Sequence, residues 1–140
     1  MHELRYTLAL CAALSCFAWT GPLGAQEKPA AATDQQPIKR TPLQRFDVPG
    51  TAYETVIGIA EIAPNVSVGR HTHPGPESGY IIEGSFELLI DGEPPRHLAA
   101  GQSYQVPPAK VHDARTGPAG AKVIATYVVE KGKPIASPIE

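Results

Sequence analysis

Prolines and glycines recur along this chain and interrupt its long helical windows. The 140 residues include 13 glycines and 15 prolines. A proline inside a helix removes a backbone hydrogen bond and clashes with the preceding turn, which argues against a helical bundle. The sequence instead predicts one small all-β domain in which short strands are joined by tight turns.

Short apolar runs alternate with turn residues at the spacing that is typical of strands. The expected strands cover residues 53–63, 66–73, 78–83, 86–90, 96–98, 103–106, 111–115 and 122–130. The segment Gly117-Pro118-Ala119-Gly120 is expected to turn the chain before the last of them. Because closure removes exposed strand edges, this pattern predicts a closed or double-sheet β fold.

The first 25 residues have the pattern of a secretory signal peptide. Arg5 precedes an uncharged run over residues 6–19, and small residues lead up to Ala25. We expect cleavage after Ala25 and Sec-type export to the periplasm or the cell exterior; a retained anchor and a lipoprotein modified at Cys16 are the alternatives. The apolar run is shorter than the roughly 20 residues of a membrane span, so no span is expected after cleavage.

The expected mature chain has no cysteine, because Cys11 and Cys16 both lie in the signal segment. Disulfides and thiolate chemistry are therefore excluded from the mature domain. Residues 26–44 are expected to form a flexible linker, residues 45–133 the folded β domain and residues 134–140 a C-terminal tail. The net charge of −2 and the lack of a Lys/Arg run exclude a nucleic-acid partner.

Three histidines and one glutamate form the candidate metal site. His71 and His73 are two residues apart, so on a strand both side chains lie on one face. Glu77 follows after Pro74-Gly75-Pro76, and His112 comes 35 residues later. Neutral imidazoles with a carboxylate suit Mn, Fe, Co, Ni, Cu or Zn rather than Mg or Ca. A lone His-x-His, by contrast, is more often a surface or hydrogen-bonded pair.

Two motifs in this region resemble those of the cupin superfamily, specifically its small single-domain type-2 members. The first is His71-Thr72-His73-Pro74-Gly75-Pro76-Glu77 with Gly84 after six further residues. The second runs from Gly101 to His112 and includes Pro107. This resemblance implies a single-domain jelly-roll β-barrel that follows the cleaved signal peptide. It also implies that His71, His73, Glu77 and His112 bind one divalent transition metal ion, namely Zn, Cu, Fe, Mn or Ni.

The chain departs from the usual cupin motifs at three positions, and none is a metal ligand. Asn65 and Ala109 stand where the motifs usually have glycine, and Thr116 stands where the second motif often has asparagine. Because alanine disfavours positive φ, Ala109 predicts a slightly different turn.

Several other side chains near the motifs are assigned to the pocket or to the outer face, from strand alternation or from their proximity to the motifs. Tyr104, Phe86 and Thr116 are the candidate pocket residues. Asp113 and Arg115 alternate with His112 and are expected to point outward.

The reaction is left open between three classes. The first is a mononuclear metal-dependent oxidoreductase of the dioxygenase type that acts on a small oxygen-containing substrate. The second is a non-catalytic periplasmic module that binds a metal or a small ligand, and the third is an isomerase or lyase acting on a sugar or small acid. No general base is evident beyond the ligands, which favours the first two. A homodimer paired through residues 53–63 or 122–130 is also expected.

Overall fold

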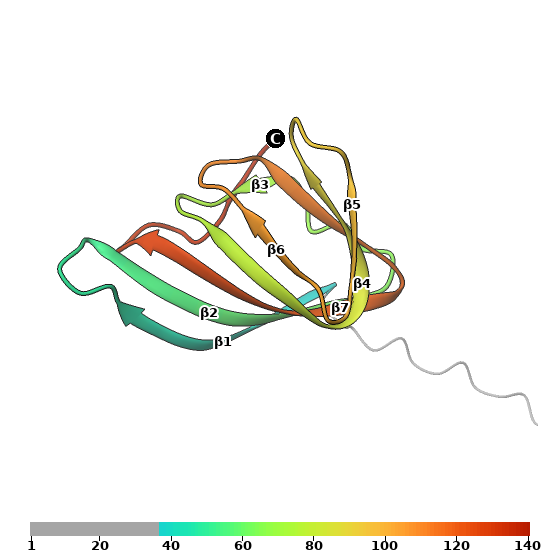
Figure 1. The fold of residues 1–140 in the computed structure, drawn as a ribbon, viewed down its shortest axis with the longest axis horizontal. Coiled ribbons are helices and arrows are strands. Elements are labelled where there is room, and N and C mark those ends of the chain that lie inside the picture. The colour runs from blue at the N-terminus through green and yellow to red at the C-terminus, as the bar shows by residue number, and fades with distance from the viewer. Residues whose placement is uncertain (1–36) are drawn as a thin grey trace, which may run out of the picture. The chain divides into compact units, whose positions relative to one another are not determined.

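The computed structural model describes residues 37–140, and this part of the chain is entirely β (Figure 1). Its strands are β1 (Ile38–Asp47), β2 (Tyr53–Ile62), β3 (His71–Thr72), β4 (Glu77–Ile90), β5 (Arg96–Ala99), β6 (Ser103–Val106), β7 (His112–Glu130) and β8 (Ser137–Pro138). Over these residues no helix could cross a membrane. The expected signal peptide lies outside the described residues.

All strand pairs are antiparallel and belong to one curled sheet (Figure 1). The strand order is β1-β2-β7-β3-β8, and β4 pairs with β5, β6 and β7. The long strands β4 and β7 pair along most of their lengths, with irregular register on both sides of Gly84. Gly84 and Gly120 both have positive φ and lie close together, so the two strands bend at the same place. This common bend curls the sheet around its interior, as expected for a jelly roll.

Several strands that the sequence divides are continuous in the structure. The expected strands 78–83 and 86–90 form β4, and 111–115 and 122–130 form β7. The turn expected at residues 117–120 is instead a bend within β7, between the residues Thr116 and Ala121 that pair with β4. Of the expected strand 66–73, only His71–Thr72 is a strand.

The first strand begins inside the segment that the sequence assigns to the linker. β1 starts at Ile38, whereas the linker was expected to continue to residue 44. Nearly all of β1 is exposed, so its sequence lacks the apolar alternation that marks a half-buried strand. Its pairing with β2 makes it a strand, and this pairing is a long-range contact that composition does not reveal.

The interior is filled by apolar side chains from the two long strands and their neighbours. The core cluster consists of Ile81, Phe86, Leu88, Ile90, Leu98, Tyr104, Val106, Ala121 and Val123. In β4 and β6, buried and exposed residues alternate, as expected for strands with one face toward the core. The packed core therefore occupies one part of the interior and leaves the part near β3 to polar groups.

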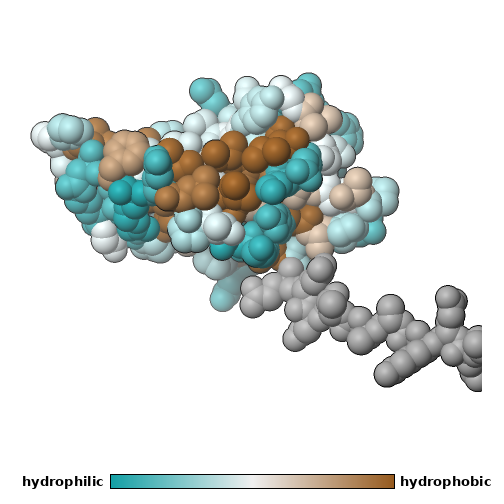
Figure 2. Space-filling model, turned by 90° about the horizontal axis from the view of Figure 1, so that it is seen from below, coloured by the Kyte–Doolittle hydropathy of each residue, from teal (hydrophilic) through white to brown (hydrophobic). Residues whose placement is uncertain are grey.

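An apolar band crosses the outer face on the side where β1 and β2 lie (Figure 2). Exposed side chains of β1 and β2 include Leu43, Phe46 and Tyr53. The edges that the sequence predicts for dimer pairing are not free, because β2 lies between β1 and β7, and β7 lies between β2 and β3. Among the described strands, β1 is the long edge strand on this side, so the predicted pairing edges are wrong.

Candidate metal centre

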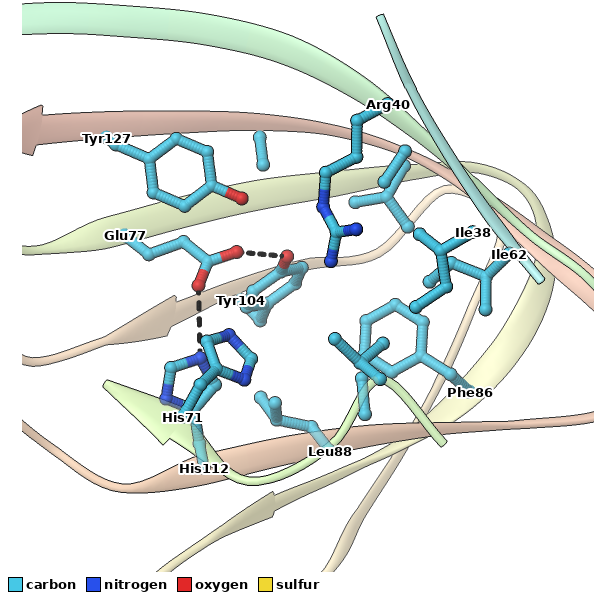
Figure 3. A pocket seen from close by; sticks show the side chains of 15 residues that line it. Ile38, Arg40, Ile62, His71, Glu77, Phe86, Leu88, Tyr104, His112 and Tyr127 are labelled. Atoms are coloured by element: carbon cyan, nitrogen blue, oxygen red, sulfur yellow. Dashed lines mark hydrogen bonds and ion pairs between the residues drawn. The ribbon is translucent and has the colours of Figure 1, made fainter. Parts of the chain in front are cut away.

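The structure brings His71, His73, Glu77 and His112 together. Figure 3 shows three of them, His71, Glu77 and His112. His71 on β3 lies directly opposite His112, which begins β7. His73 follows just after β3, and Glu77 begins β4. One ligand atom from each of the four side chains lies within 4.8 Å of the others. Strand pairing thus joins two motifs that are far apart in the sequence.

Each of the three imidazoles is oriented by a backbone carbonyl oxygen. The Nδ1 atoms of His71, His73 and His112 lie 2.7, 2.6 and 2.9 Å from the carbonyl oxygens of Gly69, Ile135 and Lys110. A carbonyl oxygen only accepts hydrogen bonds, so in each ring Nδ1 donates the proton. The neutral tautomer then leaves Nε2 with a free lone pair, which is the arrangement that metal-binding histidines usually have.

The free Nε2 atoms converge on a carboxylate oxygen rather than on a hydrogen-bond donor. His73 Nε2 and His112 Nε2 lie 2.9 and 3.3 Å from Oε2 of Glu77, and all three side chains are buried. With Nδ1 carrying the single proton of each neutral ring, neither Nε2 has a hydrogen-bond partner. Buried lone pairs facing one another are costly unless a cation or a proton lies between them. The four residues therefore fit a transition metal ion.

The pKa shifts of the cluster indicate that a proton would compete with a metal ion for the space between the imidazoles and Glu77. Burial alone would raise the pKa of Glu77, but its close contacts with the His112 and His73 rings hold that pKa well below its usual range. Burial lowers the pKa of His71. Burial also opposes protonation of His112, but its contact with Glu77 outweighs burial and raises the pKa of His112 above 6.5. The raised pKa of His112 means that a proton on this ring competes with a metal ion.

Two of the three predicted pocket residues line the cavity beside these ligands. Tyr104 donates a hydrogen bond from its hydroxyl to Oε1 of Glu77 at 2.8 Å. Phe86 packs edge-on against Tyr104, with ring centroids 5.5 Å apart. Burial and the neighbouring Glu77 charge raise the pKa of Tyr104, so its hydroxyl stays protonated and donates to the carboxylate. Tyr104 therefore orients Glu77.

The third, Thr116, does not line this cavity but lines a separate pocket together with Phe86 and Arg115. Its hydroxyl donates to the carbonyl oxygen of Ala63 at 2.7 Å and accepts from the backbone nitrogen of Val66 at 3.0 Å. These hydrogen bonds hold the loop that follows β2.

The cavity beside the ligands is small and mostly apolar. Its volume is about 60 Å³, enough for a few atoms of a ligand. Its walls are formed by Ile38, Arg40, Ala60, Ile62, Val68, His71, Glu77, Phe86, Leu88, Tyr104, His112, Ala114, Val123, Ala125 and Tyr127. Arg40 is a polar contributor that sequence reasoning did not assign to a ligand site.

The turn before His112 keeps the left-handed backbone despite its alanine. Ala109 has φ of +59°, and its N–H donates to the carbonyl oxygen of His73 at 2.8 Å. The expectation of a different turn at this position is therefore wrong. This hydrogen bond ties the second motif to the first and offsets part of the cost of positive φ in alanine.

Asp113 is a buried carboxylate that the sequence placed on the outside. It accepts hydrogen bonds from the Ser67 hydroxyl at 2.7 Å and from the Gly69 backbone at 2.9 Å. Burial opposes its ionisation, but these bonds and Arg115 lower the pKa of Asp113. The loop before β3 covers this face of β7, and Asp113 fixes the loop whose Gly69 carbonyl orients His71. Arg115 is exposed, as expected.

The C-terminal tail completes the site through its backbone. β8 pairs with β3, and the Ile135 carbonyl accepts the hydrogen bond from His73. Sequence reasoning missed this contact because a main-chain carbonyl leaves no signal in the residue type. The tail expected at residues 134–140 is thus packed against the site.

Deleting residues 134–140 is expected to weaken metal binding by about 10- to 100-fold, because His73 loses the carbonyl that orients its ring. A chelator competition titration measures the change. Ile135→Ala is the matched control, since it keeps the carbonyl and removes only the side chain. Full affinity in the truncated protein, or an equal loss in Ile135→Ala, would contradict a role for the carbonyl.

Comparison with known proteins places this chain beside several enzymes. A dimethylsulfoniopropionate lyase, DddW, from Ruegeria pomeroyi is 35% identical over 69 residues, which cover 49% of this chain and 45% of the lyase. The crystal structure of DMSP lyase DddQ from Ruegeria pomeroyi matches with a TM-score of 0.63 and 19% identity, over 81% of this chain and 57% of the other. The chain therefore matches only about half the length of these lyases.

A further structural match is the polyketide cyclase RemF from Streptomyces resistomycificus, with a TM-score of 0.58 and 22% identity over 75% of this chain and 72% of the cyclase. Structural similarity at such low identity shows a shared fold. The family model of the cupin domain matches residues 58–130, more than half of the chain, and includes all four candidate ligands. The chain belongs to the cupin family.

Proposed function

We propose that this protein is an exported mononuclear metal-dependent enzyme, an oxidoreductase of the dioxygenase type acting on a small oxygen-containing substrate. The observation that carries the metal site is the convergence of two buried, unpartnered imidazole nitrogens on the Glu77 carboxylate. His71, His73, Glu77 and His112 would hold the ion. A transition metal with four protein ligands supplies Lewis acidity and open coordination positions for substrate.

The surrounding residues orient the ligands and limit the substrate. Tyr104 holds one carboxylate oxygen of Glu77, and three backbone carbonyls fix the imidazole rings. The walls are mostly apolar, and the small cavity admits only a few substrate atoms next to the ligands. These features support a small substrate with oxygen donors.

Elemental analysis of the protein isolated from its native compartment tests the metal site. For an exported, unfolded chain we expect mainly Cu or Zn, because these ions bind such a site more tightly than Mn or Fe. Oxygen uptake is then measured for the Fe-, Mn-, Cu- and Ni-loaded proteins with hydroxy ketones, diketones and catechols. Uptake with a redox metal supports the dioxygenase proposal, whereas its absence with every metal would leave the non-catalytic binding module as the better account.

A lyase is the second candidate, and the 35% identity to a dimethylsulfoniopropionate lyase is the observation that favours it. A lyase needs no dioxygen, so the two proposals separate in an anaerobic assay. Conversion of dimethylsulfoniopropionate by the metal-loaded protein without oxygen would support the lyase and count against the oxidoreductase.

Metal affinity is expected to fall as the pH falls from 7.5 to 5.5. The pKa of His112 is raised, so its second proton stabilises the metal-free fold at low pH, and this stabilisation is lost as the pH rises through that pKa. The ion therefore displaces a proton over this range, which costs affinity up to tenfold per pH unit per proton. Isothermal titration with Zn²⁺ at several pH values measures the slope, and a flat profile would contradict histidine ligation.

We also propose that the protein is exported. Mass analysis of the mature protein in a periplasmic fraction tests cleavage after Ala25.

We propose that the protein forms a dimer in which the exposed edge of β1 pairs with β1 of a second copy. This pairing would also bury the exposed apolar side chains of Leu43 and Phe46 on β1. Light scattering tests this arrangement, and Phe46→Glu is expected to give a monomer.

A further inference from the structure

Arg40 places a positive charge beside the site, and no acidic side chain of residues 37–140 forms an ion pair with it. It lies on β1, outside both histidine motifs, and Figure 3 shows its guanidinium reaching into the pocket. Its neighbours Lys39 and Arg45 form ion pairs with Glu61 and Glu54. Over residues 37–140, Arg40 itself forms no ion pair and no side-chain hydrogen bond. Within this part of the chain its five N–H groups have no protein partner, and the exposed side chain is accessible to a ligand.

The charge balance of the pocket favours an anion. The acidic side chain in its wall is Glu77, which already accepts a hydrogen bond from Tyr104 and contacts two imidazoles. A divalent ion held by Glu77 would leave the site with a net positive charge, and Arg40 adds another. Low-dielectric walls strengthen the resulting field, so the pocket attracts small anions.

A second, larger cavity meets the first one at Arg40. Its volume is about 240 Å³, and Arg40, Ala60, Ala125 and Tyr127 line both cavities. The other walls of this outer cavity are mostly apolar and include β2 and the C-terminal tail. An apolar cavity of about 150 Å³ is known to hold benzene, so the outer cavity is large enough for a six-membered ring. Arg40 thus stands between the small cavity beside the metal ligands and a larger apolar cavity.

We propose that Arg40 is the substrate-anchoring residue of this site and that it binds the carboxylate of a small amphipathic acid. The carboxylate would occupy the inner cavity between Arg40 and the metal ligands, while the apolar part would fill the outer cavity. The planar guanidinium matches a carboxylate with two parallel hydrogen bonds, which an ammonium group does not reproduce. This inference deepens the proposed function and rests on it for the position of the metal.

Benzoate serves as the probe, because it combines a carboxylate with one ring. Its binding is measured by isothermal titration calorimetry to the Zn²⁺-loaded and the metal-free protein, with benzamide as the uncharged analogue. Arg40→Met removes the charge and keeps a side chain of similar length. Arg40→Lys keeps the charge but loses the planar guanidinium and its two parallel hydrogen bonds. Lys39→Met is the matched control, because Lys39 lies on the same strand but pairs with Glu61.

We expect Arg40→Met to weaken benzoate binding tenfold or more in both forms, with Arg40→Lys between it and the unchanged protein. Lys39→Met should bind benzoate normally, benzamide should bind weakly throughout, and the Zn²⁺ content should not change in any variant. Benzoate binding that is absent, or unaffected by Arg40→Met, would overturn the inference. If the protein binds no metal, the proposed function fails, but the effect of Arg40 in the metal-free protein still decides this inference.

Discussion

Replacing His112 with alanine is expected to lower metal affinity at least about a hundredfold and to abolish any metal-dependent activity. His112 contributes a buried Nε2 that lies 3.3 Å from Glu77 and has no other partner. Loss of a residue that merely orients a ligand costs 10- to 100-fold in affinity, so loss of a ligand itself should cost at least as much as the upper end of that range. Metal content after dialysis against a weak chelator measures the effect.

Two further variants separate ligand loss from general damage to the fold. His112→Gln retains much of the volume and polarity of the side chain, so it should also lose the metal while its metal-free melting temperature stays close to that of the unchanged protein. His97→Ala removes an exposed histidine whose Nε2 lies 3.4 Å from Oε1 of Glu87, away from the ligands, and this variant should bind metal normally. Unchanged metal content in both His112 variants would disprove the assignment.

Gly75→Ala is expected to destabilise the fold by about 3 kcal/mol and to weaken metal binding as well. A Cβ atom at this position would overlap the carbonyl oxygen of Val128, which is part of the β7 backbone. Backbone cannot yield as a flexible side chain does, so the loop itself must move. Because Gly75 lies between His73 and Glu77, that movement would displace two of the four ligands.

Gly117→Ala is the control for Gly75, since an added Cβ there meets nothing within 4 Å and the backbone has no positive φ. Chemical denaturation should show a change within about 0.5 kcal/mol for Gly117→Ala. Near-native stability and normal Zn²⁺ affinity in Gly75→Ala would show that the loop tolerates a side chain and that this close approach does not position the ligands.

The four candidate ligands could be predicted because their chemistry is carried by residue type and spacing. Histidine and glutamate are uncommon in a buried β interior, and His71, His73, Glu77 and His112 recur at intervals that resemble cupin motifs. The structure places them within 4.8 Å of one another. Tyr104 and Phe86 were also found, because both lie on strands next to the motifs and point inward.

Other residues of the candidate site were missed because their roles depend on contacts that the residue type does not encode. The backbone carbonyl of Ile135 orients His73, although any residue at that position would supply the same oxygen. Asp113 was placed outside by strand alternation, but a loop covers that face of β7 and buries it. Arg40 was assigned to a linker, because the exposed strand β1 has no apolar period.

The sequence by itself determined that this is a turn-rich β domain and identified which side chains are able to bind a metal. Both conclusions follow from local chemistry: prolines exclude long helices, and imidazoles with a carboxylate suit transition metals. The tertiary structure decided which strands merge, where β1 pairs and what surrounds the ligands. These features depend on contacts between distant segments, such as His71 with His112 and β1 with β2, whose energy comes from pairing and burial rather than from any one residue.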